Sequence, residues 1–237
     1  MTVDSSGTKQ FYYLSTGNTG TSNNNGIGNV TAFDLDGDHI TDYVYAGDLM
    51  GNLWRFDLTN KVETSWAVSP GPLFKTPNGQ PITSAVTAVI GPTAAGPNTL
   101  MILFGTGRRV QFTNATPVAL QPATQSLYGV WDWNMSSWNT LSATQFASLS
   151  TGASGLSGPN FTLGQTNLQQ QVFTLNADTI TRDINNPTAI CWAGSAACTG
   201  TQQFGWYVNM IGSLEQDHLQ PAVGAWCLQR ELDRARQ

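Results

Sequence analysis

Four aspartates stand in a short segment whose spacing is typical of a cation-binding loop. The segment Asp34-Leu-Asp-Gly-Asp-His-Ile-Thr-Asp42 has carboxylates at its first, third, fifth and ninth positions. A loop that curls around one ion points its odd positions inward, and calcium takes about six to eight oxygen ligands in a flexible shell. The spacing therefore predicts a calcium site built from four side chains and one main-chain carbonyl, with the ligands Asp34, Asp36, Asp38, Ile40 (carbonyl) and Asp42.

Two residues inside the loop bear on this prediction. Gly37 allows a sharp turn between the second and third ligands. The sixth position of such loops is commonly glycine because its φ is positive, and in this loop the sixth residue is His39. Histidine tolerates that conformation better than most residues, so we expect a weaker site rather than none. Since oxygen ligands dominate, calcium is favoured over a transition metal on His39. The alternative is a solvated acidic turn, in which four neighbouring carboxylates would repel one another.

The elements that must position the loop are strands. The twelfth position is Tyr45 rather than the glutamate of an EF-hand, and a strand-like run follows the loop instead of a helix. We predict a hairpin with strands at Asp42–Gly47 and Leu53–Leu58 and a tight turn at Asp48–Asn52. The period-two alternation places Tyr43, Tyr45, Leu53 and Arg55 on one face and Val44, Trp54 and Phe56 on the other.

Short strand-like runs alternate with turn signals along the rest of the chain. We predict strands at Gln10–Ser15, Ala85–Ile90, Thr99–Gly105, Ser126–Asp132, Gln171–Leu175 and Gly205–Val208, and helical turns at Gln145–Leu149 and Leu168–Gln170. Gly28–Leu35 matches Gly51–Leu58 at five of eight positions, as two similar strand ends would. Many short strands without long helices predict an all-β fold, either a propeller or a sandwich.

Composition excludes several classes of function. Charged residues make up 11% of the chain, against about 25% in an ordinary soluble domain. Fifteen acids outnumber ten lysines and arginines, which argues against nucleic acid as a partner. No apolar run approaches the roughly 20 residues of a spanning helix, so we expect no membrane insertion by this chain. Of the tryptophans, we expect Trp54, Trp131 and Trp206 in the core, and Trp133 and Trp138 in a loop where they could stack on sugars.

The cysteines and the two ends of the chain suggest an exported protein. Cys191 and Cys198 enclose six residues, five of them small, so they form either a local disulfide or two free thiols. The N-terminus has no signal peptide, which leaves a cytoplasmic protein or an excerpt of a longer exported one. We expect residues 1–212 to form a partial β-propeller domain and residues 213–237 a divergent tail with a truncated or frameshifted end.

The segment from Asp34 to Leu58 resembles the hallmark segment of the type IV pilus PilC/PilY family of tip-associated adhesins and biogenesis factors. Leu103–Arg108, Gln125–Asp132 and Gly205–Val208 resemble later strands of that family in the same order. The resemblance implies a modified β-propeller of short antiparallel blades, with one calcium ion in the loop that ends at Asp42. It also implies a non-enzymatic, cell-surface role, in which calcium occupancy controls pilus extension, retraction or adhesion. The implied partners are minor pilins and surface receptors.

Two other functions share part of the pattern. A quinone- and calcium-dependent propeller dehydrogenase needs adjacent cysteines, and the sequence has no such pair. With two histidines and no Ser-His-Asp arrangement, hydrolase chemistry has little support. A generic calcium-stapled sugar-binding adhesin would share the loop but not the match over Tyr43–Leu58. We therefore expect a calcium-stapled scaffold rather than an enzyme.

Overall fold

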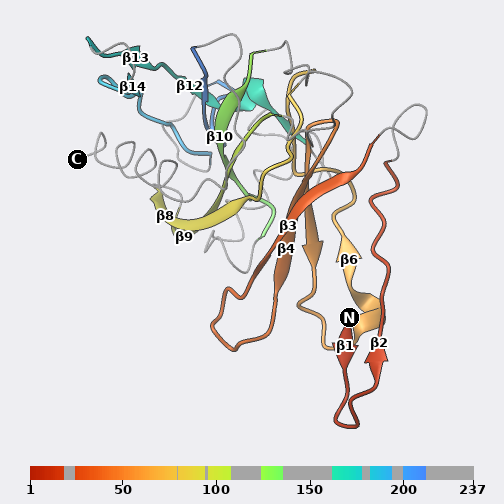
Figure 1. Cartoon of the computed structure of the whole chain (residues 1–237). Coiled ribbons are helices and arrows are strands. Elements are labelled where there is room, and N and C mark those ends of the chain that lie inside the picture. Colours follow the sequence, from red (N-terminus) through yellow and green to blue (C-terminus); the bar gives the residue numbers. More distant parts are fainter. Residues whose placement is uncertain are drawn as a thin grey trace, which may run out of the picture.

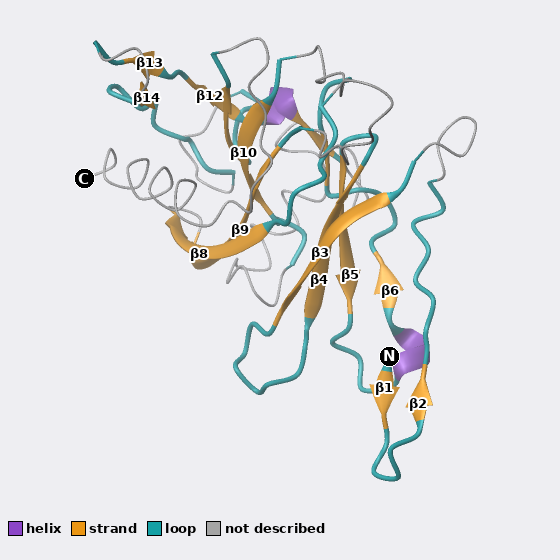
Figure 2. Cartoon of the chain, in the orientation of Figure 1, coloured by secondary structure: helices purple, strands orange, loops and turns teal. Residues whose placement is uncertain are grey.

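The described part of the chain is almost entirely strand and loop. The computed structural model describes residues 1–18, 25–78, 80–93, 96–107, 124–135, 162–177, 182–193 and 200–211. Within these ranges the helices are two short 3-10 turns, η1 (Glu63–Ser65) and η2 (Gln165–Asn167) (Figure 2). Neither has the length that a bilayer crossing by a helix requires. The all-β class predicted from the sequence is confirmed.

The first large sheet carries the acidic loop (Figure 1). Its strand order is β11-β7-β5-β4-β3, and β6 pairs with β5 beside this path. The strands are β3 (Ile27–Phe33), β4 (Tyr43–Asp48), β5 (Asn52–Asp57), β6 (Ala67–Val68), β7 (Phe74–Lys75) and β11 (Leu163–Gly164). All these pairings are antiparallel except that of β11 with β7.

The second large sheet packs against the first. Its order is β12-β15-β10-β9-β8, with β8 (Thr87–Thr93), β9 (Gly96–Gly105), β10 (Ser126–Trp131), β12 (Gln169–Gln171) and β15 (Gly205–Asn209). Two small hairpin sheets complete the described strands: β1 (Thr2–Val3) with β2 (Lys9–Gln10), and β13 (Thr174–Leu175) with β14 (Arg182–Asp183). Each large sheet thus contains four antiparallel strands in a row, the arrangement of a propeller blade.

The hairpin prediction is confirmed to within one residue at each end of β4 and β5. The two similar segments, Gly28–Leu35 and Gly51–Leu58, cover all but the first residue of β3 and the whole of β5, which lie on either side of β4. The similarity therefore marks two strands that pair with the same neighbour.

Three local predictions are wrong. The predicted strand Gln171–Leu175 is divided between the last residue of β12 and the separate strand β13. In the predicted strand Gln10–Ser15 only Gln10 is in a strand, and the following residues pair with no ladder. The predicted helical turn at Leu168–Gln170 is strand β12 from Gln169 onward, and the turn lies three residues earlier. Leu168 is buried in the core, so packing decides where the turn ends. The other predicted turn, Gln145–Leu149, lies outside the described residues.

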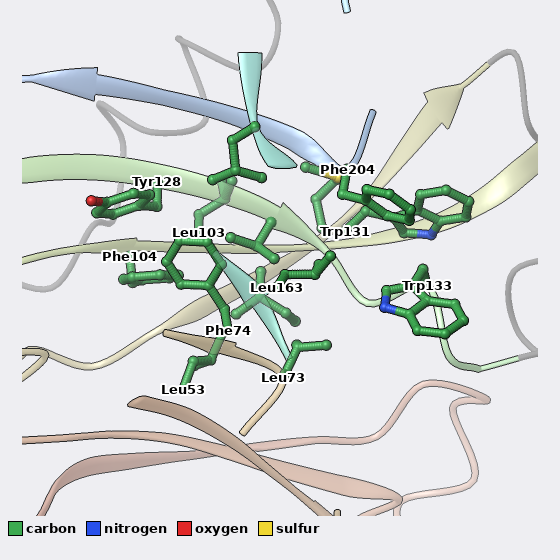
Figure 3. Packing of buried hydrophobic residues seen from close by; sticks show 14 of the residues in the cluster. Leu53, Leu73, Phe74, Leu103, Phe104, Tyr128, Trp131, Trp133, Leu163 and Phe204 are labelled. Carbon is green, nitrogen blue, oxygen red and sulfur yellow. The ribbon is translucent and has the colours of Figure 1, made fainter. Parts of the chain in front are cut away.

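One continuous hydrophobic core lies between the two large sheets (Figure 3). The ring of Phe74 on β7 lies 5.9 Å from that of Phe104 on β9 and 5.1 Å from that of Tyr128 on β10, measured between centroids. Aromatic pairs at these centroid separations stabilise a fold by more than the burial of their apolar area alone. The two sheets are therefore joined by packed rings as well as by loops.

The predictions for the tryptophan side chains are confirmed in part. Trp54, Trp131 and Trp206 are buried, as predicted. Trp133 is only 1% exposed and its ring lies edge-on to Phe204 at 6.2 Å, so its prediction as a sugar-stacking residue is wrong (Figure 3). Trp133 follows β10 directly after Asp132 and belongs to the buried cluster between the two sheets. Trp138 lies outside the described residues.

The hairpin of β4 and β5 is covered on both faces. Tyr45 and Leu53 belong to the core between the sheets. Ala46, Trp54 and Phe56 form a second cluster on the opposite face, where Leu14 of the N-terminal arm packs on them. The predicted assignment of side chains to two faces is thus confirmed, and it fixes the hairpin that carries the loop.

Candidate metal centre

The acidic loop joins β3 to β4 and is tied to the sheet at both ends. Phe33 and Tyr43, the last and first residues of these strands, are register partners. The main-chain N–H of Asp42 donates to the carbonyl of Phe33 at 2.9 Å, and the carbonyl of Asp42 accepts from Leu58 N–H at 2.8 Å. The first and last acids of the loop are therefore held beside each other by the ladder.

The aspartate carboxylates order the loop by accepting main-chain hydrogen bonds. Asp34 accepts from Gly37 N–H through Oδ1 and from His39 N–H through Oδ2, each at 2.7 Å. The pattern continues at Asp36, Asp38 and Asp42, which accept from the N–H groups of Asp38, Ile40 and Leu35 at 3.1, 2.8 and 2.8 Å. Each carboxylate oxygen has two lone pairs, so these bonds leave capacity for a cation.

Three of the predicted ligands converge. One carboxylate oxygen each from Asp34, Asp36 and Asp42 lies within 4.8 Å of the others. Asp38 falls outside this group, and the side chain of Ile40 is 65% exposed, pointing its apolar part to solvent. Hard oxygen donors at this spacing fit calcium better than a softer metal.

The charge state of Asp34 suits a ligand. Partial desolvation acts against its ionisation, but the hydrogen bonds from Gly37 and His39 outweigh it, so the pKa of Asp34 lies below its ordinary value. Hydrogen bonds to a carboxylate stabilise its charged form. The first residue of the loop is therefore ionised at neutral pH.

The backbone of the loop follows the prediction made for it. Gly37 has φ 82° and His39 has φ 71°, both in the left-handed region. His39 is the one non-glycine residue with positive φ in the part of the chain that the structure describes. That conformation costs an L-residue about 1 kcal/mol or more. The loop thus keeps the left-handed turn even though a histidine occupies it.

Sequence reasoning placed Asp48 at the start of the tight turn but gave its carboxylate no partners, although it belongs to the same run of acids. Asp48 ends β4, is fully buried and accepts main-chain hydrogen bonds from Met50 and Asn52 at 2.9 Å. Its other oxygen accepts from the Trp54 indole at 2.9 Å and from the amides of Asn52 and Asn25 at 2.8 and 2.9 Å. Asp48 therefore holds the β4–β5 turn rather than a metal. An aspartate three residues before glycine in a turn is the signal that could have shown this.

Asp132 is a second buried acid with no role in the sequence interpretation. It follows β10 and forms an ion pair with Arg55 of β5, with 2.6 Å between Oδ1 and Nη1. Its Oδ2 accepts from the Tyr45 hydroxyl at 2.7 Å. Burial and the charge of Asp132 together raise the pKa of Tyr45 well above its ordinary value. The two sheets are thus linked by a charged contact inside the core.

The disulfide prediction is supported at one of its two cysteines. Cys191 is disulfide-bonded. Cys198 lies outside the described residues, so the pairing of the two stays a prediction.

Each large sheet contains a blade-like row of antiparallel strands, and the acidic loop joins two neighbouring strands of the first, which is the arrangement expected in a β-propeller domain. A sequence model of the family described as the PilY1 beta-propeller domain matches residues 6–186. The chain therefore belongs to the PilY1 β-propeller family.

Individual relatives agree with this assignment. The type IV pilus biogenesis factor PilY1 of Pseudomonas aeruginosa strain PAO1 is 33% identical over 234 residues, which cover 86% of this chain and 18% of the relative. A PilY1 homolog of Xylella fastidiosa is 38% identical over 119 residues, covering 46% of this chain and 8% of the relative. The crystal structure of the Pseudomonas aeruginosa PilY1 C-terminal domain has a TM-score of 0.52 and 28% identity, over 79% of this chain and 39% of that one. The chain thus spans a small part of these relatives.

Proposed function

We propose that the chain is a calcium-binding scaffold of a type IV pilus biogenesis factor, with the ion held by the loop from Asp34 to Asp42. The observation that carries the proposal is the convergence of three carboxylate oxygens, from Asp34, Asp36 and Asp42, within 4.8 Å. Like charges at this separation repel, and a divalent cation would offset the repulsion. The Asp38 carboxylate and the Ile40 carbonyl are the remaining ligands that we propose.

The role of the loop follows from its attachments. Asp34 directly follows β3 and Asp42 directly precedes β4, so ligation of both residues would staple the two strands together. Without the ion we expect the loop and the start of the hairpin to loosen. The loop is then a two-state element through which calcium occupancy changes an exposed surface of the domain.

The proposed role in the type IV pilus comes from the names of the relatives. They are named type IV pilus biogenesis factors, and we propose the same system for this chain, at the cell surface. Minor pilins and surface receptors are the partners that we propose, with calcium occupancy controlling pilus extension, retraction or adhesion. The exposed acids of the loop support this, because a partner can reach them. We propose a binding role without catalysis.

Calcium titration tests the proposal. Isothermal titration of the chain should give a dissociation constant between about micromolar and millimolar. Asp34→Ala and Asp42→Ala should abolish the binding heat. Asp4→Ala is the matched control, because Asp4 is an exposed acid that also accepts main-chain hydrogen bonds but lies in the β1–β2 hairpin. Equal calcium binding in all four proteins would overturn the proposed site.

The pilus part needs a separate measurement. The same substitutions, placed in the full-length protein that carries this domain, should change the number of surface pili in cells. Loss of calcium binding with unchanged piliation would contradict control by calcium while leaving the site itself intact.

A further inference from the structure

Asp132 is connected to both ends of the acidic loop, although it follows a strand of the second sheet and lies far away in the sequence. Both of its carboxylate oxygens are engaged by residues of the first sheet. Oδ1 pairs with the Arg55 guanidinium at 2.6 Å, and Oδ2 accepts from the Tyr45 hydroxyl at 2.7 Å. Asp132 is fully buried, so water does not compete for these bonds.

The Tyr45 branch leads to the start of the loop. The ring of Tyr45 packs against the ring of Phe33, with 5.7 Å between centroids in a T-shaped arrangement. Phe33 is the last residue of β3, and Asp34 follows it directly. The hydroxyl bond to Asp132 fixes the Tyr45 ring, and this ring holds Phe33, the residue beside the first ligand.

The Arg55 branch leads to the end of the loop. The guanidinium of Arg55 lies 6.0 Å from the centroid of the Tyr43 ring, within the range of a cation–π contact. Tyr43 is the first residue of β4, and Asp42 precedes it directly. The ion pair with Asp132 therefore also fixes the residue beside the last ligand.

We propose that Asp132 is a positioning residue of the candidate calcium site. Phe33 and Tyr43 face each other across the ladder. The two branches together therefore set the distance between the backbones of Asp34 and Asp42. Ligands that are already in place need not be ordered when the ion binds, which raises the affinity. The inference rests on the proposed calcium function and adds a residue outside the loop to it.

The inference has a reciprocal consequence. If the contact with Asp132 favours calcium binding, calcium must favour that contact by the same factor. Calcium should therefore slow hydrogen exchange in β10, which precedes Asp132, as well as in the loop.

Tyr45→Phe is the sharpest test, because it removes only the hydroxyl and leaves the ring against Phe33. Tyr128→Phe is the matched control: Tyr128 is equally buried and its hydroxyl is also hydrogen-bonded, to Gln80 and Gln165, but it has no contact with the loop residues. We expect Tyr45→Phe to weaken calcium binding by at least about fivefold in isothermal titration. Tyr128→Phe should leave the dissociation constant unchanged while lowering the melting temperature measured in EDTA.

The outcomes separate this inference from the proposed function. If the wild-type chain binds no calcium, the proposed function fails. If the wild type binds calcium and Asp34→Ala does not, but Tyr45→Phe binds as tightly as the wild type, only the positioning role fails. Equal weakening in Tyr45→Phe and Tyr128→Phe would also overturn it, because the effect would then reflect general destabilisation. Asp132→Asn should act like Tyr45→Phe and should remove the calcium-dependent protection of β10.

Discussion

The indole N–H of Trp54 donates to Oδ2 of Asp48 at 2.9 Å inside the first sheet. Asp48 also accepts hydrogen bonds from Asn52 of β5, from Met50 of the turn and from Asn25 before β3. Asp48→Asn would replace part of this acceptor by an NH₂ group that faces other donors. We expect a loss of about 3 kcal/mol in the free energy of unfolding, because buried hydrogen bonds to a charged group are lost. Urea denaturation of the chain measures it.

The control for this prediction is Asp4→Asn. Asp4 also accepts several hydrogen bonds, from Ser6 and Thr8, but it is exposed, so water can replace them. The free energy of unfolding should change far less in Asp4→Asn than in Asp48→Asn. Similar losses in the two variants would show that burial of Asp48 is not the cause.

Gly129 is required by its neighbour across the ladder. It pairs with Trp206, and a Cβ at position 129 would lie 2.4 Å from the indole Nε1. Since Trp206 is fully buried and cannot withdraw, Gly129→Ala should destabilise the chain by about 1–3 kcal/mol. Gly26→Ala is the control, because Gly26 is exposed and its nearest neighbour is 4.0 Å from the added Cβ. Thermal unfolding that shows no difference between the two would contradict the steric argument.

His39 determines how much strain the acidic loop stores. Its φ of 71° suits glycine, is tolerated by histidine and is strongly disfavoured for a β-branched residue. Calcium affinity should therefore decrease in the order His39→Gly, wild type, His39→Val, with the valine variant weaker than wild type by about tenfold. Isothermal titration gives the order. Equal affinities would show that the strain at this position does not affect binding.

Tyr45 should make the protein sensitive to alkali. Burial and the nearby charge of Asp132 raise the pKa of Tyr45 well above 10, its usual value, in the folded state. Above pH 10 the unfolded chain releases a proton that the native state keeps, so unfolding is favoured by up to about 1.4 kcal/mol per pH unit. The wild type should be more stable than Tyr45→Phe at pH 8, and this advantage should shrink as the pH rises beyond 10.

Urea midpoints at pH 8 and above pH 10 test this. Tyr13→Phe is the control, because the side chain of Tyr13 is 97% exposed. A stability difference between the wild type and Tyr45→Phe that stays constant with pH would contradict the prediction.

Local patterns predicted much of the site. The residues from Tyr43 to Phe56 gave the hairpin, its turn and its two faces, because successive side chains of a strand point to opposite faces and each face here meets a different cluster. The spacing of the acids gave the loop, and the left-handed backbone at His39 was foreseen from loop geometry. Ligation by Asp34, Asp36, Asp38, Ile40 and Asp42 stays a prediction.

Other features could not be predicted from local patterns. The contacts of Asp132 depend on how two sheets pack, and nothing near Asp132 in the sequence indicates Arg55 as its partner. Trp133 was misplaced for the same reason, since its burial depends on packing against residues far away in the sequence, such as Phe204. At Leu168 the burial of one side chain outweighed the local helical tendency.

The ion pair of Arg55 with Asp132 also bears on how the protein folds as it is made. The two residues are 77 positions apart. At about 5–20 residues per second, the ribosome adds Asp132 roughly 4–15 s after Arg55. During that interval the face of β5 that carries Arg55 has no second sheet to pack against, so Arg55 stays solvated and this face of the hairpin stays unburied. The hairpin that carries the acidic loop should therefore reach its final packing only after the second blade has begun to form, so that the two blades mature as one cooperative unit.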